Sequence, residues 1–155
     1  MQDRYSFRGK RIKDGEWVEG AYYEEPYTER CYIVQWNSFG LGFNEFIEVD
    51  PSTICQCTGF KDKNGKLIFE NDILMCHGNP NDLVKVVFGK FTVINAETLE
   101  NIDEVIGWHY EVIPTDDISR CEPFCLSMPI TEDYVKRCEF EVIGNLIDNP
   151  ELLEV

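Results

Sequence analysis

The segment CTGFKDKNGKLIFENDIL, residues 57–74, constrains the fold of this chain more than any other stretch. It places a charged, glycine-containing sequence between two apolar runs. Residues 63–66 predict a tight turn, in which Asn64 and Gly65 supply the positive φ angles that most residues resist. Asp62 precedes this turn, where its carboxylate is suited to accept hydrogen bonds from backbone N–H groups.

A second corner is expected at ENDI, residues 70–73, directly after the short apolar stretch 67–69. Two closely spaced corners around a short apolar stretch are typical of the start of a small β-barrel. The pattern resembles an SH3-like barrel at the level of the fold only. We expect the segment to carry shape and no chemistry, with a structural signature made of Gly59, Asp62, Asn64, Gly65, Asn71 and Asp72.

Apolar and polar residues alternate along most of the chain, which indicates β-strands. Asp14-Gly15 predicts a hairpin turn between the first two strands, and Pro51 should end the fourth because it has no N–H for a ladder. Gly89 is expected to break the apolar run 83–94 into two strands. The expected strands are residues 5–12, 16–24, 30–36, 43–49, 52–57, 73–77, 83–88, 90–94, 108–113 and 138–145.

The periodicity changes at residues 96–107, AETLENIDEVIG, where apolar residues recur at helical spacing. This predicts one short amphipathic helix ending near Gly107, followed later by a long irregular connection at 114–137. Pro150 suits the first position of a final helical turn. The predicted fold is mainly β, with an SH3-like, barrel-like lobe packed with an N-terminal hairpin or sheet lobe. We expect one domain over 1–155, or two lobes at 1–57 and 58–155.

The net charge of the chain is −15, and it is concentrated near the C-terminus. Residues 97–155 carry fifteen acidic and three basic side chains. Such a field repels nucleic-acid phosphates and favours basic partners or divalent cations. No apolar run approaches the roughly 20 residues of a membrane span, and no apolar stretch follows the charged N-terminus. We therefore expect a soluble intracellular protein that binds neither membranes nor nucleic acid.

Histidine and cysteine could build a metal site only from scattered residues. His77, His109, Cys121 and Cys125 are the candidates, but their spacing matches no usual zinc ligand pattern. The pair Cys55-x-Cys57 places both side chains on one face of a strand, as core residues would be. We expect the seven cysteines to be small buried apolar residues, with no metal and no cofactor.

Other catalytic patterns are equally unspecific. No local signature selects a cysteine–histidine pair as nucleophile and base. The carboxylate pairs Asp116-Asp117 and Glu132-Asp133 lie in polar segments typical of solvated loops. The loop SFGLGF, residues 38–43, has Gly-x-Gly but no helix behind it for a phosphate. Aromatic residues gather around this loop, and they predict either a core or a contact surface: Trp36, Phe39, Phe43 and Phe46.

Three blocks of the sequence resemble the YopX protein family of phages and prophages: FRGKRIKDGEWVEG (7–20), CQCTGFKDKNGKLIFENDIL (55–74) and EFEVIGNLIDNPELL (139–153). The chain departs from the family pattern at Asn71, where glycine is usual, and at Cys57, where an aromatic residue is usual. The resemblance implies a mainly β, phage-encoded protein with a tendency to self-associate. It carries over no catalytic residue.

The leading hypothesis is a non-enzymatic accessory protein, located in the cytoplasm of a bacterial host, that acts through protein contacts or homo-oligomer assembly. One alternative is an acidic mimic of DNA that inhibits a host nucleic-acid enzyme. A second alternative is a metal-dependent hydrolase that uses the acidic loops.

Overall fold

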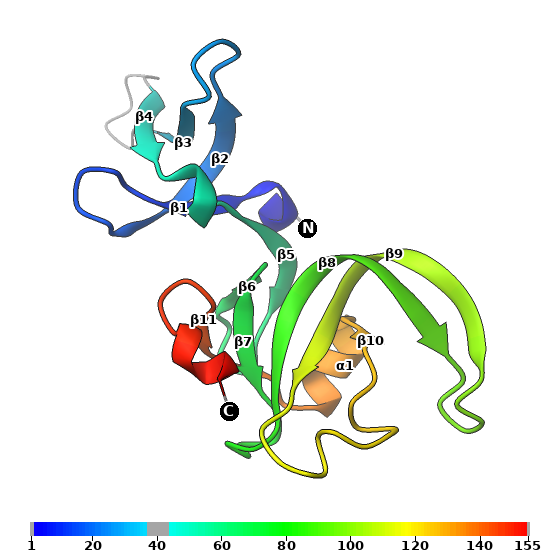
Figure 1. The fold of residues 1–155 in the computed structure, drawn as a ribbon. Helices are drawn as coiled ribbons and strands as arrows, with labels where there is room; N and C mark the ends of the chain where they lie inside the picture. The colour runs from blue at the N-terminus through cyan, green and yellow to red at the C-terminus, as the bar shows by residue number, and fades with distance from the viewer. Residues whose placement is uncertain (1, 37–43, 155) are drawn as a thin grey trace. The chain divides into compact units, whose positions relative to one another are not determined.

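The computed structural model describes residues 2–36 and 44–154, which are mainly β (Figure 1). The chain divides into two compact units, Met1–Gly59 and Phe60–Val155, which are described separately. The mainly-β prediction is confirmed: eleven strands and one short α-helix account for the regular structure of the described residues, together with three 3-10 helices.

The first unit is an antiparallel sheet with the strand order β4-β3-β2-β1-β5. The turn between its first two strands contains Gly15, whose φ of 71° confirms the predicted hairpin turn, and an ion pair between Arg11 and Asp14 at 2.7 Å. Its elements are η1 (Gln2–Tyr5), β1 (Phe7–Lys10), β2 (Trp17–Glu24), β3 (Cys31–Trp36), β4 (Asn44–Val49), η2 (Pro51–Thr53) and the beginning of β5 (Cys55–Lys61).

The described core of the first unit lies on one face of this sheet. Its fully buried members are Ile33 and Val49, which are at most 1% exposed, and Cys31 and Val18 pack with them. Burying one such aliphatic side chain contributes about 1.5–3 kcal/mol. Alternate side chains of the same strands point to the opposite face of the sheet.

The segment expected as a strand over 52–57 begins differently. Residues Pro51–Thr53 form η2, capped by Asp50, whose side chain accepts a hydrogen bond from the N–H of Ser52 at 2.9 Å. Proline at the first position and an acidic cap favour a helical turn over a strand here. β5 starts only at Cys55 and continues past Gly59 into the second unit.

The second unit contains a five-stranded antiparallel sheet with the order β10-β9-β8-β7-β11. The end of β5 pairs with β6. Strand pairings among the described residues form open sheets, so a closed SH3-like barrel is not seen in them. The further elements are β6 (Leu67–Phe69), β7 (Asp72–Met75), β8 (Leu83–Ile94), β9 (Asn101–Ile113), β10 (Met128–Pro129), α1 (Glu132–Arg137), β11 (Glu141–Asn145) and η3 (Pro150–Leu153).

β8 and β9 form a long curved ribbon with β10 and α1 on its concave side (Figure 1). The prediction of a helix over 96–107 is wrong, because residues from Asn101 onward pair with β8 along its whole length. The predicted break at Gly89 is also wrong: Gly89 pairs with Gly107 inside one continuous strand. Backbone pairing with a neighbouring strand has overridden the local helical spacing.

The connection 114–137, expected to be irregular, ends in β10 and α1. Thr131 caps α1 by accepting a hydrogen bond from the N–H of Tyr134 at 3.1 Å. Glu132 and Asp133 make i,i+4 ion pairs with Lys136 and Arg137. No helix in the described ranges is long and apolar enough to cross a membrane.

The core of the second unit joins the ribbon to α1. Val84 and Val86 of β8, Val135 of α1 and Phe140 are at most 5% exposed and belong to one cluster. A separate cluster forms around Ile73, with Leu83 and Ile113. The concave side of the ribbon is thus packed at its root, near the beginning of β8 and the end of β9.

Candidate functional site

The turn after β5 is built around the carboxylate of Asp62, which is 6% exposed. Its Oδ1 accepts hydrogen bonds from the N–H groups of Asn64 and Lys66 at 2.8 and 2.9 Å. Its Oδ2 accepts one from the N–H of Val142, in β11, at 3.0 Å. The expected role of Asp62 as a backbone acceptor is confirmed, and the contact with β11 shows that it also links distant parts of the unit.

Positive φ angles occur at three of the six signature residues: Gly59 at 86°, Gly65 at 81° and Asn71 at 67°. The prediction is wrong for Asn64, which has no positive φ. A turn that closes with one left-handed residue needs that conformation only at Gly65. The side chain of Asn64 instead donates to Glu141 at 3.5 Å.

Asp72 forms the second corner and is fully buried. Its Oδ2 accepts a hydrogen bond from the N–H of Phe69 at 2.8 Å. The N–H of Asn71 donates to the carbonyl of Val86 at 2.9 Å, which ties the corner to β8. These hydrogen bonds hold the backbone of the second corner in one conformation. That the signature carries shape and no chemistry stays a prediction.

The structure does not gather the four candidate metal ligands. His77 is exposed, and its Nδ1 lies 3.5 Å from Glu139. His109 is 2% exposed and stacks on Phe91 with ring centroids 4.6 Å apart. Within the described ranges, no group of three or more His, Cys, Asp or Glu side chains is arranged to hold a metal ion.

The cysteines divide by burial. Cys55 and Cys57 are fully buried, which confirms the expectation that they are core residues, and all seven thiols are free. Cys125 and Cys138 are only half-buried, and Cys121 departs most from the expectation because it is exposed. Its position in a polar surface loop, and not its residue type, determines its exposure.

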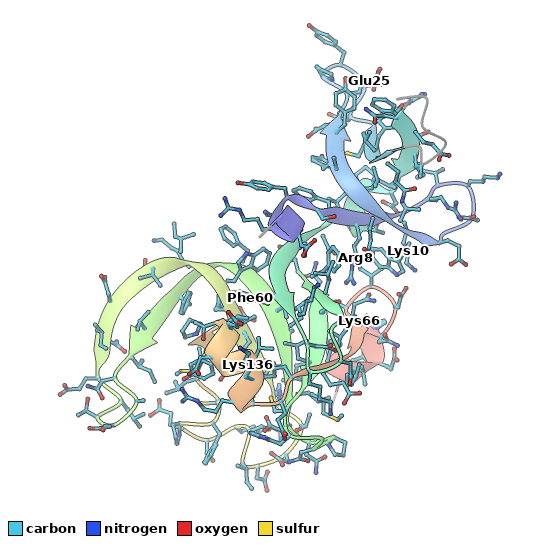
Figure 2. The ribbon with its side chains drawn as sticks, turned by 180° about the vertical axis from the view of Figure 1, so that it is seen from behind. Arg8, Lys10, Glu25, Phe60, Lys66 and Lys136 are labelled. Atoms are coloured by element: carbon cyan, nitrogen blue, oxygen red, sulfur yellow. The ribbon has the colours of Figure 1, made fainter. Side chains whose placement is uncertain are left out.

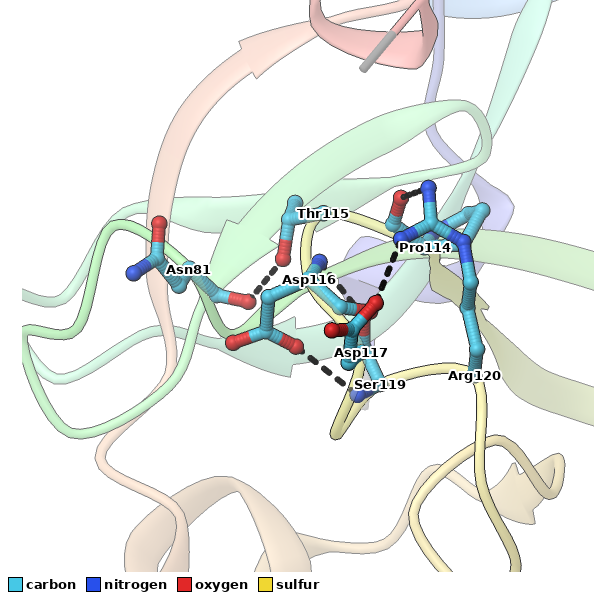
Figure 3. Close-up of polar contacts among 7 residues, drawn as sticks. All are labelled: Asn81, Pro114, Thr115, Asp116, Asp117, Ser119 and Arg120. Carbon is cyan, nitrogen blue, oxygen red and sulfur yellow. Dashed lines mark hydrogen bonds and ion pairs between the residues drawn. The ribbon is translucent and has the colours of Figure 1, made fainter.

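Asp116 stabilises the loop after β9 through a reciprocal pair of bonds with Ser119 (Figure 3). The N–H of Ser119 donates to Oδ1 of Asp116 at 2.8 Å, and the N–H of Asp116 donates to Oγ of Ser119 at 3.0 Å. The backbone bond from Ser119 lowers the pKa of Asp116. Beside them Arg120 lies 4.0 Å from Asp117 and donates to the carbonyl of Pro114 at 3.0 Å. These carboxylates bind backbone groups and a cation within their own loop, as a solvated loop predicts.

Three aromatic rings lie together on the exposed face of the first unit, and we call Tyr23, Tyr32 and Phe46 the aromatic face. Their centroids are 5.8–6.3 Å apart, with Phe46 edge-on to both tyrosines. Tyr23 is 43% and Phe46 is 56% exposed. Phe46 is one of the four aromatic residues that the sequence predicted to form a core or a contact surface. The side chains of Trp36, Phe39 and Phe43, like the Gly-x-Gly loop, lie outside the described residues.

The two tyrosines of the aromatic face were not singled out from the sequence. In the register of the sheet, Tyr23 stands opposite Tyr32, and Val34 stands opposite Phe46. Alternation along β2 and β3 places both tyrosines on the side away from Ile33. That alternation was the signal that could have identified them.

The same unit packs cations against an aromatic ring. Arg8 and Lys10, both from β1 and labelled in Figure 2, lie over the ring of Trp17, with the Arg8 guanidinium carbon 4.7 Å and the Lys10 Nζ 5.4 Å from its centroid. Attraction between a cation and a ring face contributes about 0.5–1 kcal/mol at exposed sites and about 2 kcal/mol when the cation is desolvated, as it is for Arg8 at 7% exposure.

Comparison with known proteins identifies the family of this chain but assigns it no activity. No curated protein matches the chain. The family described as YopX protein matches residues 6–154, which include the turn at Asp62, the corner at Asp72 and the strands of both units. The chain therefore belongs to the YopX family.

Proposed function

We propose that this protein is a non-enzymatic, phage-type accessory protein that acts by binding a basic protein partner through the aromatic face. The observation that carries the proposal is the exposure of Tyr23 and Phe46, 43% and 56%, on a sheet whose other face holds the core of the first unit. Exposed tyrosine and phenylalanine side chains dominate the energetics of many protein interfaces.

The charge around the aromatic face favours a basic partner over a second copy of this chain. Glu48 stands directly opposite Tyr32 in the sheet register, where it also lies 4.0 Å from Arg30, and alternation along β2 places the exposed Glu19 on the same side as Tyr23. Two copies, each with a net charge of −15, would bring these carboxylates together and repel. An arginine-rich or lysine-rich surface would instead pair with the carboxylates and stack on the rings.

The test is a pull-down from bacterial cells that carry the prophage, with wild-type protein and two variants as bait. The variant Tyr23→Ser/Phe46→Ser removes two rings of the aromatic face. The control Tyr27→Ser removes a tyrosine that is 95% exposed but lies in the turn between β2 and β3. Circular dichroism checks that both variants fold.

A basic protein retained by wild type and Tyr27→Ser, and lost with the double variant, supports the proposal. Its retention should weaken between low and high salt, because exposed charge pairs are screened. A strict monomer in light scattering that captures no partner would overturn the proposal. Equal capture by the double variant would also overturn it, because the aromatic face would then carry no binding.

The two alternatives remain predictions. For the DNA mimic, free carboxylates should lie in rows, whereas several acidic residues of 97–155 are paired within the fold: Glu104 with Lys90, Glu111 with Lys85, Glu132 with Lys136 and Glu141 with Lys63. A salt-independent interaction with host DNA-handling proteins would exclude the mimic. Elemental analysis, with activity screening on nucleotide and ester substrates, tests the hydrolase.

A further inference from the structure

A cavity of about 470 Å³ lies in the second unit, independent of the aromatic face. Its wall includes Val84, Tyr110 and Val112 on the concave side of the β8–β9 ribbon, Tyr134 of α1, and residues of the loop after β9. Cavities of about 300–1,000 Å³ with mostly apolar walls are typical of small-molecule sites. Its size is therefore sufficient for a small organic ligand.

The cavity opens to solvent through exposed apolar side chains. Ile118 and Phe124 from the loop after β9 are 63% and 62% exposed, and Leu99 from the turn of the ribbon is 36% exposed. The loop that carries Ile118 is held by the Asp116–Ser119 bonds of Figure 3. The exposed part of the cavity lining is therefore apolar.

Asp82 interacts electrostatically with three other polar side chains of the cavity lining. Cys76 and Cys138 line it together with Asp82 and Tyr110. Burial raises the pKa of the Cys76 thiol and of the Tyr110 hydroxyl, and the Asp82 carboxylate adds to the rise at Cys76. Both groups are therefore neutral hydrogen-bond donors at pH 7, and the Asp82 carboxylate is the charged group beside them.

The charge of the lining is negative. Asp82 and Asp116 contribute carboxylates, and no lysine or arginine is among the lining residues of the described part of the chain. Among the described lining residues there is also one histidine, His77, whose Nδ1 lies 3.5 Å from Glu139. A carboxylate at the end of an apolar cavity attracts a cation and repels an anion, and the low-dielectric walls strengthen that preference. Tyr110 adds a ring that attracts cations, whereas the ring of Tyr134, 6.4 Å away, already carries the Arg137 guanidinium 5.3 Å from its centroid.

We propose that this cavity binds a small organic cation, an apolar or aromatic body with one amino group, with the ammonium beside Asp82. The apolar body lies between Val84, Val112 and the apolar loop residues. The ammonium group donates hydrogen bonds to the Asp82 carboxylate, which the neutral donors around it do not neutralise.

The experiment titrates the full-length protein with three probes of similar size: 2-phenylethylamine, 2-phenylethanol and 3-phenylpropanoate. Isothermal calorimetry at low salt measures the affinities. The amine should bind at least tenfold more tightly than the alcohol, and the carboxylate should not bind. High salt should weaken the amine and leave the alcohol unchanged.

Three variants locate the site. Asp82→Asn should reduce the amine's affinity to that of the alcohol, whereas the control Asp117→Asn, whose fully exposed side chain does not line the cavity, should leave it unchanged. Phe124→Arg places a cation at the exposed mouth and should weaken the amine without affecting folding. No amine binding at millimolar concentration, equal affinity for all three probes, or wild-type affinity in both Asp82→Asn and Phe124→Arg would overturn the proposal.

Discussion

The turn at residues 62–66 and the turn at residues 95–100 are closed by the same device in different surroundings. In the first, Oδ1 of Asp62 accepts the N–H groups of Asn64 and Lys66. In the second, Oδ1 of Asn95 accepts the N–H groups of Glu97 and Thr98 at 2.9 and 3.1 Å. Asp62 is buried and Asn95 is exposed, so water can replace the acceptor only in the second turn.

The two turns also place different residues in the left-handed conformation. Gly65 has a φ of 81°, which glycine adopts freely, whereas Leu99 has a φ of 60°, which strains a residue with a Cβ. Asp62 additionally binds the N–H of Val142, 80 residues away in the chain. The turn at 62–66 is therefore fixed by tertiary contacts. The turn at 95–100 is closed by local hydrogen bonds and keeps Leu99 in a strained backbone conformation.

The largest effect should come from removing the buried acceptor. Asp62→Ala leaves the N–H groups of Asn64, Lys66 and Val142 without their partner, and we expect a loss of about 3–5 kcal/mol in the free energy of unfolding. Asn95→Ala should lose at most about 1 kcal/mol, because water satisfies the exposed donors. Urea denaturation of both variants measures the difference. Equal losses would show that burial does not distinguish the turns.

Gly65→Val should have the next largest effect. A Cβ at Gly65 would meet no atom within 4 Å, so the expected loss of about 1–3 kcal/mol arises from the backbone conformation alone. Gly89→Val is the matched control: its Cβ also meets no atom within 4 Å, but Gly89 lies in β8 without a positive φ. Thermal melts should show Gly89→Val at least as stable as wild type. If Gly65→Val melts like wild type, the segment is not rigid, and a direct binding role for KDKNGK becomes the better interpretation.

Predictions from the sequence succeeded where local chemistry alone determines the structure. Alternation identified β2, β3 and β4, because these strands bury side chains at every second position along part of their length, whereas β1 buries two consecutive residues, Arg8 and Gly9. Turn chemistry identified the acceptor Asp62 and the left-handed Asn71, because the residue types alone favour those roles. These features depend on local chemistry that the sequence displays.

The helix predicted at 96–107 failed because its apolar residues do not share one buried face. Ile102 and Ile106 are 63% and 68% exposed in the ribbon. The segment is a strand because β8 supplies its pairing partners, such as Phe91 for Val105. A partner strand from earlier in the chain is not visible in a local window. The same limit applies to the cavity, which several distant segments line.

The strained turn of the ribbon gives a smaller effect of opposite sign. Leu99→Gly should stabilise the protein by about 0.5–1 kcal/mol, because the relief of the left-handed strain exceeds the entropy that glycine adds to the unfolded chain. The control Ile102→Gly, at a position without a positive φ, should destabilise. Urea denaturation compares the two. A loss of stability in Leu99→Gly would show that the leucine side chain contributes more through packing than its conformation costs.

The smallest effect is expected at Asn71, where the chain departs from the glycine usual in the family pattern. Its φ of 67° strains the backbone less than the same angle strains leucine, since asparagine is enriched in this conformation. The backbone bonds of Asn71, from its N–H to Val86 and from the N–H of Leu146 to its carbonyl, remain available to glycine. Asn71→Gly should therefore change the free energy of unfolding by no more than about 0.5 kcal/mol, because relief of strain and added unfolded-state freedom nearly cancel. Thermal melts of Asn71→Gly and Leu99→Gly, measured side by side, show which substitution relieves more backbone strain. A loss above about 1.5 kcal/mol in the free energy of unfolding, about three times that limit, would contradict this prediction. It would mean that the Asn71 side chain stabilises the second corner through a polar contact, as Asp62 stabilises the first.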